Sequence, residues 1–295
     1  MQKDKMLQKG FVILNYNDCN TTAALIRHMR SSGITDAICV VDNCSKDESY
    51  DRLIQLDFEN CVVLRSEENR GYAAGNNIGC RYLIDTGKAD IVFIANPDIE
   101  FSKETVDKIV SLFAQNDDYA ILTPLMYKPD GSVSDRPFIR LPSYFQDLML
   151  CFYFYNRIYE KKYAYSVEQT AGIIDVDAAP GSFFAIRAEA LKQVDYLDEG
   201  TFLYYEEMIL AMKMRNCSRR WKIGLVPSLD YIHHHSVSIR NSLSVMNSYK
   251  IYMNSKMYFE KKYHRIGIVK QKLLRIAIMI SCAEEWGILH ICGKN

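Results

Sequence analysis

The first 116 residues alternate short apolar runs with longer amphipathic segments, and this alternation constrains the fold most strongly. A short continuous apolar run predicts a strand that is buried on both faces. Repeated strand–helix–strand units predict an α/β fold with a mostly parallel central sheet, right-handed crossovers and flanking helices. The predicted strands are residues 11–16, 37–41, 61–65 and 90–95; the predicted helices are residues 21–33, a helix opened by a Ser-x-x-Glu capping box at 45–48, a helix that ends at Gly87, and residues 102–116.

Each predicted strand is followed by amide or carboxyl side chains. In a parallel sheet, ligands bind beyond the carboxyl ends of the strands. Neighbouring strands lie only about 4.8 Å apart, so groups that follow them can gather along one edge. We therefore predict a binding site at this edge, formed by Asn15, Asn17, Asp42, Asn43, Asn69, Asn96 and Asp98.

Composition excludes several classes of protein. The 36 lysines and arginines balance 36 aspartates and glutamates, which argues against nucleic acid as a partner. The nine cysteines include no Cys-x-x-Cys, so neither a metal knuckle nor a disulfide framework is expected. The start, MQKDKMLQKG, lacks the apolar segment of a signal peptide, and no run reaches the roughly 18 apolar residues of a spanning helix. We expect a cytoplasmic protein that can still contact the inner face of a membrane.

The second half of the chain does not continue the alternation. Residues 143–165 are aromatic and are predicted to be irregular, whereas residues 201–216 lead from aromatic side chains into a helix and residues 221–227 form a strand. No Pro- or Gly-rich linker is present, which argues against an independent second domain. We expect one domain over residues 1–240 and a C-terminal helical extension over residues 241–295 that packs on it.

The segment Asn96-Pro97-Asp98, directly after the fourth predicted strand, is the first candidate site. A simple turn explains these residue types as well. A rigid aspartate at a strand end can instead help to hold Mg²⁺ or Mn²⁺, which neutralises the charge of a leaving nucleoside diphosphate. Asp42 then has an alternative role, because acidic residues at strand ends also accept hydrogen bonds from a base or ribose.

The segment ENRGYAAGNNIG, residues 68–79, is the second candidate. Its glycines permit close approach of the backbone, and the N-terminus of the following helix favours phosphate. The segment is neither a G-x-G-x-x-G nor a P-loop with its Lys-Ser/Thr. Close packing of the helix explains Gly75 and Gly79 equally well.

Two further clusters carry titratable groups. Glu206 and Glu207 in YYEEM can be partners of a helix dipole, or one of them can be the general base that deprotonates a sugar acceptor. The tyrosines before them either pack against sugar rings or fill the core. Of the consecutive histidines 233–235, at most two share one face of a strand. One of these can reach a metal or a phosphate, and a buried, hydrogen-bonded histidine is the alternative.

In this order, the segments resemble the family 2 inverting glycosyltransferases with the GT-A fold. Within that family they are most similar to the rhamnosyltransferase-like branch that builds bacterial surface polysaccharides. The resemblance covers roughly residues 11–240, and it includes APGSFFAIRAEAL (179–191) and VPSLDYIHHHSVS (226–238). It implies a GT-A, Rossmann-like fold for nucleotide-diphospho-sugar transfer.

The resemblance also implies a role for each candidate residue. Glu207 occupies the position of the catalytic base, and Glu206 lies beside it. Asp98 corresponds to the aspartate that binds Mg²⁺ or Mn²⁺, and His233 or His234 matches a histidine near the metal and diphosphate. The residues that would border the nucleotide are Asn15, Tyr16, Asn17, Asp42, Asn43, Asn69, Gly71 and Asn76.

The implied reaction moves rhamnose or a similar sugar from dTDP-rhamnose or a UDP-sugar to a lipid-linked saccharide. Two departures from the family pattern matter. The base is usually aspartate, where this chain has Glu207, and a second aspartate often follows where this chain has Ile209. Glu206 is therefore an alternative base, and a catalytically degenerate nucleotide-sugar-binding protein with a regulatory or assembly role is the alternative function. A homodimer stays open, and a sugar nucleotidyltransferase is disfavoured because LNYNDCN lacks a Gly-rich basic loop.

Overall fold

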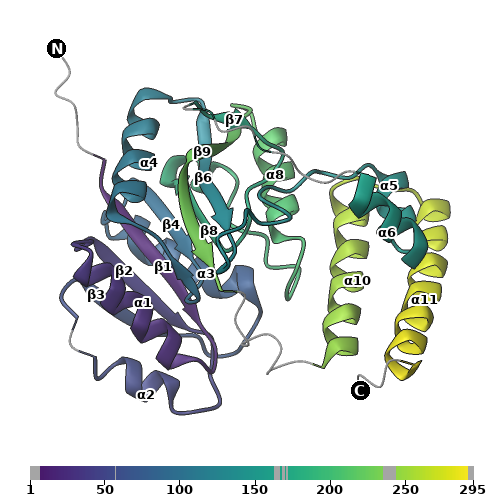
Figure 1. Cartoon of the computed structure of the whole chain (residues 1–295), viewed down its shortest axis with the longest axis horizontal. Helices are drawn as coiled ribbons and strands as arrows, with labels where there is room; N and C mark the ends of the chain where they lie inside the picture. Colours follow the sequence, from purple (N-terminus) through teal and green to yellow (C-terminus); the bar gives the residue numbers. More distant parts are fainter. Residues whose placement is uncertain are drawn as a thin grey trace.

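A central sheet with helices on both faces forms most of the molecule, and a group of helices stands beside it (Figure 1). The computed structural model describes residues 7–56, 58–162, 167, 170, 172–234 and 244–291. Within these residues the sheet has nine strands, of which eight follow the order β3-β2-β1-β4-β8-β6-β9-β5. The alternation in the first half of the sequence accounts for one side of this sheet.

The first four strands are parallel, as the sequence predicts. Strand β1 lies between β2 and β4, and β3 pairs with the outer side of β2. Parallel neighbours require crossovers, and two long helices, α1 and α3, and the short helix α2 supply them, while α4 follows β5 and leads to β6. The strands are β1 (Lys9–Asn15), β2 (Ala37–Asp42), β3 (Cys61–Arg65) and β4 (Ile91–Ala95), and the helices are α1 (Cys19–Ser31), α2 (Ser49–Leu53), α3 (Tyr72–Asp85) and α4 (Lys103–Gln115).

Alternate residues of β1 explain why its apolar run is continuous. Phe11 and Ile13 face the core under α1 and α4, whereas Val12 faces the core under α3. All three side chains are fully buried. Each such burial stabilises the fold by about 1.5–3 kcal/mol. The rings of Phe11 and Phe93 stack at 4.9 Å between centroids, which ties β1 to β4.

The starts of these helices follow local side-chain chemistry. Ser102 caps α4, because its hydroxyl accepts a hydrogen bond from the Thr105 amide at 3.0 Å. The capping box predicted at residues 45–48 is wrong, since α2 begins at Ser49 without a side-chain cap. The Ser45 hydroxyl instead accepts a hydrogen bond from the Asn17 amide at 2.9 Å. Ser45 therefore links two strand ends.

The second half of the sheet mixes strand directions. Strand β8 (Phe183–Arg187) lies antiparallel between β4 and β6 (Tyr119–Tyr127), and β9 (Lys222–His233) runs parallel to β6. The short strands β5 (Ile99–Glu100) and β7 (Ile174–Asp175) both pair antiparallel with β9. The prediction of a parallel sheet thus describes the first four strands, while an antiparallel strand joins them to the rest. Two helices complete this half: α7 (Ala188–Gln193) and α8 (Glu206–Asn216).

Four helices make up the group beside the sheet. They are α5 (Tyr144–Met149), α6 (Tyr153–Lys162), α10 (Val245–Lys262) and α11 (Ile268–Ile291) (Figure 1). The irregular structure predicted for residues 143–165 is wrong, because α5 and α6 occupy most of this segment. Tyr144 and Cys151 share a buried cluster with Met253 and Leu274 of the C-terminal helices.

The boundary predicted at residues 240 and 241 lies outside the described residues. The division into a main domain and a C-terminal extension stays a prediction, and α5 packs with that extension. Within the described part of the chain, none of the helices combines the length and apolar character that a membrane crossing needs. The cysteines in this part are all free thiols.

Candidate active site

The strand register brings the predicted polar residues to one edge of the sheet. Asn15 of β1 is paired with Asp42 of β2, and Ile13 is paired with Ala95 of β4. The carboxyl ends of β2 and β4 therefore lie two strand spacings apart at the same edge, and Asp98 follows the end of β4 by three residues. That separation is roughly 10 Å, which is within the span of a nucleoside diphosphate sugar.

Asp42 organises the loop after β2 from a fully buried position. Its carboxylate accepts hydrogen bonds from Asn15 Nδ2 at 2.9 Å and from the Ser45 amide at 3.0 Å. The Arg65 guanidinium lies 3.8 Å from the same carboxylate. Both carboxylate oxygens have partners, so Asp42 fixes the shape of the loop at this edge of the sheet.

The next residue, Asn43, offers a polar atom to a ligand. Its Nδ2 donates to Asn69 Oδ1 at 3.0 Å and to the Gly71 carbonyl at 3.1 Å. Its Oδ1 is buried and, among the described residues, has no hydrogen-bond partner. An orphaned buried acceptor is costly unless a ligand satisfies it. Asn43 therefore ties the end of β2 to the segment of Asn69 and Gly71, and its Oδ1 is left without a partner inside the described part of the fold.

The glycine segment shapes the same edge through tight packing. Gly71 precedes α3 with φ +99°, and a Cβ added there would lie 2.0 Å from the Phe202 carbonyl oxygen. A Cβ on Gly75 would lie 2.4 Å from Leu14, which supports close helix packing as the reason for that glycine. Asn76 donates to the Tyr72 carbonyl at 3.0 Å, and its Oδ1 has no partner among the described residues.

The remaining nucleotide candidates lie at the end of β1. Tyr16 is half-buried, and Asn17 is exposed with φ +53°. The Asn17 Oδ1 accepts a hydrogen bond from the Lys46 amide at 2.8 Å. The exposed Asn17 thus holds two loops together, while Tyr16 borders the edge.

The chain after β4 brings Asp98 beside His233. Strand β5 pairs with the end of β9, with Ile99 opposite His233. His233 Nε2 lies 3.4 Å from Asp98 Oδ2, and the two side chains are 13% and 10% exposed. His234 turns away, because its ring lies 2.9 Å from Glu100 Oε1. Of the two predicted histidines, His233 is therefore the one beside Asp98, and His235 lies outside the described residues.

The donor set at Asp98 fits a divalent cation that phosphate oxygens also ligate. Asp98 supplies a hard carboxylate oxygen, and His233 adds an imidazole beside it. In the described ranges, no group of three or more His, Cys, Asp or Glu side chains could hold a metal by itself. Mg²⁺ is commonly bound by one or two carboxylates together with substrate phosphates and water, so a single aspartate suffices.

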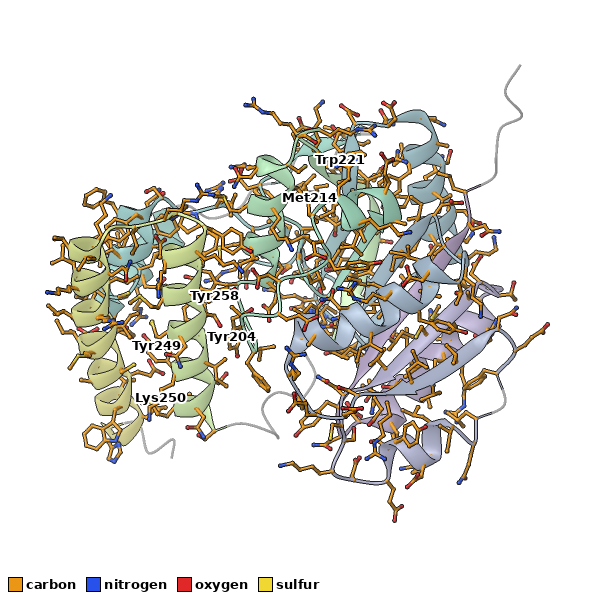
Figure 2. The ribbon with its side chains drawn as sticks, turned by 180° about the vertical axis from the view of Figure 1, so that it is seen from behind. Tyr204, Met214, Trp221, Tyr249, Lys250 and Tyr258 are labelled. Carbon is orange, nitrogen blue, oxygen red and sulfur yellow. The ribbon has the colours of Figure 1, made fainter. Side chains whose placement is uncertain are left out.

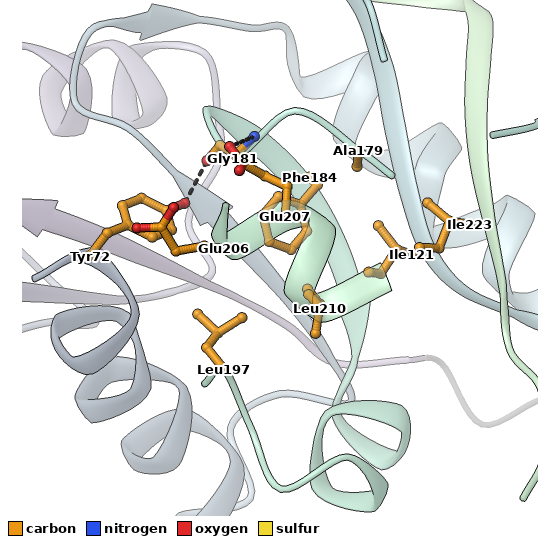
Figure 3. A pocket seen from close by; sticks show the side chains of 10 residues that line it. All are labelled: Tyr72, Ile121, Ala179, Gly181, Phe184, Leu197, Glu206, Glu207, Leu210 and Ile223. Atoms are coloured by element: carbon orange, nitrogen blue, oxygen red, sulfur yellow. Dashed lines mark hydrogen bonds between the residues drawn. The ribbon is translucent and has the colours of Figure 1, made fainter. Parts of the chain in front are cut away.

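Glu206 and Glu207 begin α8 and line a small cavity with Tyr72, Gly181 and Leu210 (Figure 3). Glu207 Oε1 accepts a hydrogen bond from the Gly181 amide at 3.2 Å. The Tyr72 hydroxyl donates to the Gly181 carbonyl at 2.5 Å. Glu207 is half-buried, whereas Glu206 is only 6% exposed and its Oε1 lacks a partner among the described residues.

The two glutamates differ in how readily they ionise. Burial, and then the neighbouring Glu207, raises the pKa of Glu206 to about 8. Burial also raises the pKa of Glu207, and the Gly181 amide opposes this rise by stabilising the carboxylate. Two close carboxyl groups resist joint ionisation. Glu207 therefore has a hydrogen-bond donor that stabilises its charged form, whereas Glu206 Oε1 has no partner among the described residues.

Hydrogen bonds connect the segment before Asp98 with the segment that holds Glu207. The Asn96 amide donates to the Ser182 carbonyl at 2.8 Å, and Ser182 follows Gly181, which holds Glu207. The Ser182 hydroxyl lies 2.7 Å from the Tyr231 hydroxyl. Burial raises the pKa of Tyr231, the hydrogen bond with Ser182 opposes this rise, and the charges of Asp98 and Glu207 add to it.

The sequence analysis missed the residues that connect these clusters. They are Tyr72, Gly181, Ser182 and Tyr231. All four lie inside motifs that the sequence analysis names, but a single tyrosine, glycine or serine there gives no local signal of a site. Tyr231 lies two residues before His233, so strand periodicity placed it on the same face as that histidine. That spacing was the available signal.

The fold and the site together define a GT-A glycosyltransferase. The chain belongs to Glycosyl transferase family 2, whose family model matches residues 11–194. The low-salt glycan biosynthesis hexosyltransferase Agl10 of Haloferax volcanii is 27% identical over 242 residues, which cover 80% of this chain and 70% of Agl10. The N-acetylglucosaminyl-diphospho-decaprenol L-rhamnosyltransferase of Mycobacterium tuberculosis is 27% identical over 217 residues, which cover 68% of this chain and 67% of that enzyme.

Solved structures share the fold at low sequence identity. GalNAc-T7, solved with UDP, GalNAc and Mn²⁺, matches 97% of this chain at a TM-score of 0.61 and 15% identity. The mannosyltransferase PcManGT from Pyrobaculum calidifontis, solved with GDP-Man and Mn²⁺, matches 98% at a TM-score of 0.58 and 12% identity. S. aureus TarS matches 92% at a TM-score of 0.53 and 14% identity. The match covers 76% of the PcManGT chain but only 58% of GalNAc-T7 and 43% of TarS.

Proposed function

We propose that this protein is an inverting hexosyltransferase that uses a nucleotide-diphosphate sugar. The observation that supports the proposal is a pair of hydrogen bonds: Gly181 donates to Glu207, and Asn96, two residues before Asp98, donates to Ser182. Glu207 takes the proton of an acceptor hydroxyl, and the acceptor oxygen bonds to the anomeric carbon. The bond from that carbon to the diphosphate breaks, the nucleoside diphosphate leaves, and the configuration inverts.

The proposal includes a divalent cation, Mg²⁺ or Mn²⁺, with Asp98 as its protein ligand and His233 beside it. When bound, such an ion neutralises negative charge on the diphosphate leaving group. Two solved relatives in fold contain Mn²⁺ together with UDP or GDP-Man, which supports this choice. The proposed donors are dTDP-rhamnose and UDP-sugars, because one relative is named a rhamnosyltransferase and GalNAc-T7 was solved with UDP.

The proposed acceptor is a lipid-linked saccharide used in surface polysaccharide synthesis. The name of the mycobacterial relative specifies a sugar linked to diphospho-decaprenol, and this supports a lipid-linked saccharide as the acceptor. Incubation with dTDP-rhamnose, UDP-sugars or GDP-sugars, a polyprenyl-diphosphate-linked N-acetylglucosamine and Mn²⁺ or Mg²⁺ tests the proposal. Mass spectrometry is expected to detect an acceptor that is heavier by one hexose or deoxyhexose. Binding of nucleotide sugars without transfer from any tested donor would contradict it and would favour the non-catalytic alternative.

A lipid-linked acceptor requires contact with a membrane surface, and the helical group offers a face for it. Large apolar side chains are exposed on α6 and α11, with Phe154 at 77% and Met279 at 72%. The exposed cations of the same helices favour an anionic surface. The exposed apolar residues of the helical group are Phe145 on α5, Phe154 and Ile158 on α6, and Ile268, Val269, Leu273, Ile276, Met279, Ile280 and Trp286 on α11, and Lys270, Lys272 and Arg275 are exposed cations on α11.

Sedimentation with vesicles tests this contact. The protein is expected to sediment with vesicles that contain phosphatidylglycerol. The double variant Ile276→Glu with Met279→Glu is expected to weaken vesicle binding at least tenfold, because charged side chains replace apolar ones that would enter the membrane surface. Ile54→Glu is the matched control, since Ile54 is 50% exposed on the sheet domain. Equal loss in the control, or self-association of the protein without vesicle binding, would contradict a membrane-facing surface.

A further inference from the structure

The loop that leads to the catalytic glutamates is fastened to α10 by side chains. The Ser255 hydroxyl donates to the Leu203 carbonyl at 2.7 Å. Tyr258 and Lys262 donate to the two carboxylate oxygens of Asp198 at 2.8 and 2.7 Å. Figure 2, which labels Tyr204 and Tyr258, shows aromatic side chains between α10 and the sheet. Helix α10 therefore contacts the loop over residues 198–205 along much of its length.

Tyr205 makes the deepest of these contacts. Its side chain is 2% exposed, and its ring packs against Phe259 of α10 with centroids 5.4 Å apart. Its hydroxyl donates to the carboxylate of Asp147 on α5, at 2.8 Å from Oδ1 and 3.1 Å from Oδ2. Asp147 in turn pairs with Lys256 of α10 at 2.9 Å, and both charged side chains are almost completely buried.

A buried ion pair of this kind is a rigid anchor. Lys256 Nζ also donates to the Asp147 carbonyl at 2.7 Å, so the lysine grips both the side chain and the backbone of α5. Two long charged groups held without water have few alternative arrangements, because each unpaired charge is strongly disfavoured in the interior. The Tyr205 hydroxyl is thus bound to a fixed point between α5 and α10.

The backbone next to this anchor is held in an uncommon conformation. Tyr204 and Tyr205 have φ values of +71° and +69°, which non-glycine residues rarely adopt. Such residues persist where the surroundings hold them in place. Glu206 and Glu207 follow directly, and the Ile209 amide donates to the Tyr205 carbonyl at 2.9 Å. The direction in which α8 starts therefore depends on Tyr205.

We propose that the Lys256–Asp147 ion pair, acting through the Tyr205 hydroxyl, positions Glu206 and Glu207 for transfer. Tyr205, Asp147 and Lys256 are positioning residues, because each of them acts through the backbone of α8. This role rests on the proposed function, in which Glu207 is the base. Under this proposal, the helical group helps to form the active site at the edge of the central sheet.

The test compares Tyr205→Phe with Tyr249→Phe. The Tyr249 hydroxyl bonds to Ser281, and Figure 2 places Tyr249 between α10 and α11, away from the loop. Each variant removes one hydroxyl from the helical group. Tyr205→Phe is expected to lower kcat about tenfold with KM for the donor unchanged, since a misplaced base slows the chemical step. Tyr249→Phe is expected to keep the kcat of the wild type.

Hydrogen exchange supplies a readout that does not depend on turnover. The Ile209 amide is expected to exchange at least tenfold faster in Tyr205→Phe and at the wild-type rate in Tyr249→Phe. Equal exchange in the two variants would overturn the positioning role, whether or not the wild type transfers sugar. Absence of transfer by the wild type, together with the expected exchange, would refute the proposed function and leave the anchor intact.

A third variant separates the hydrogen bond from the charges. Asp147→Asn combined with Lys256→Met keeps an amide oxygen for the Tyr205 hydroxyl and removes both charges. Because the ion pair that fixes the acceptor is lost, this double variant is expected to lower kcat about tenfold and to speed exchange of the Ile209 amide. If Tyr205→Phe does not fold, this double variant carries the test. Wild-type kcat and wild-type exchange of Ile209 in the double variant would overturn the role of the ion pair.

Discussion

Glu207→Gln is expected to lower kcat by roughly 10²–10⁴-fold, the usual contribution of a general base. Glutamine keeps the size of the side chain and its hydrogen bond from the Gly181 amide, but it cannot accept the acceptor proton. The dissociation constant of the donor is expected to change by less than about twofold, because the base acts in the transition state. Single-turnover kinetics with a donor–acceptor pair used by the wild type measures both quantities.

Glu206→Gln distinguishes the two carboxyl groups. Burial, and then the neighbouring Glu207, raises the pKa of Glu206 and favours its neutral form, so an amide there is expected to cost less than about tenfold in kcat. Glu189→Gln, at an exposed position on α7, is the surface control. A large loss in Glu206→Gln with normal turnover in Glu207→Gln would contradict the assignment and would make Glu206 the base.

The pH profile follows from the same ionisation. Transfer requires the charged form of Glu207, whose pKa is raised above its usual value. Activity is therefore expected to be present above that raised pKa and to fall as the pH drops through it. The acid limb is expected at a higher pH than an exposed glutamate would give, and it should disappear in Glu207→Gln.

The edge of the sheet was predictable because two local signals coincide there. Buried parallel strands appear in the sequence as continuous apolar runs, and the polar residue after each run marks the strand end. Asn15, Asp42 and Asn96 were placed by this pattern, and the register of β1 with β2 and β4 agrees with it. The pattern could not show that the Asp42 carboxylate accepts hydrogen bonds from Asn15 and Ser45, since those contacts form only in the folded loop.

The direction of the later strands and the structure of the helical group were harder to predict from the sequence. The apolar run of β8 has no feature that distinguishes an antiparallel strand from a parallel one. In residues 143–165, aromatic and charged residues are interspersed without clear helical spacing, and α5 and α6 owe their positions to contacts with α10 and α11. The partners of Tyr205 and Gly181 lie 58 and 26 residues away, beyond the reach of local patterns.

Asp98→Ala is the second substitution with a large expected effect. The carboxylate is the hard oxygen ligand at this edge, and charge neutralisation of a leaving diphosphate is worth several kcal/mol. A loss of about 4 kcal/mol corresponds to a decrease of roughly 10³-fold in kcat/KM. Glu100→Ala is the matched control, because Glu100 lies two residues away, is exposed and contacts His234.

The most direct test of a shared site for metal, diphosphate and base is ³¹P NMR of dTDP or UDP with substoichiometric Mn²⁺. Paramagnetic broadening of the diphosphate resonances, beyond that of a protein-free sample, is expected with the wild type and with Glu207→Gln. It is expected to return to the protein-free level with Asp98→Ala, because the site then lacks its carboxylate ligand. Undiminished broadening with Asp98→Ala, or none beyond the protein-free level with the wild type, would contradict the account.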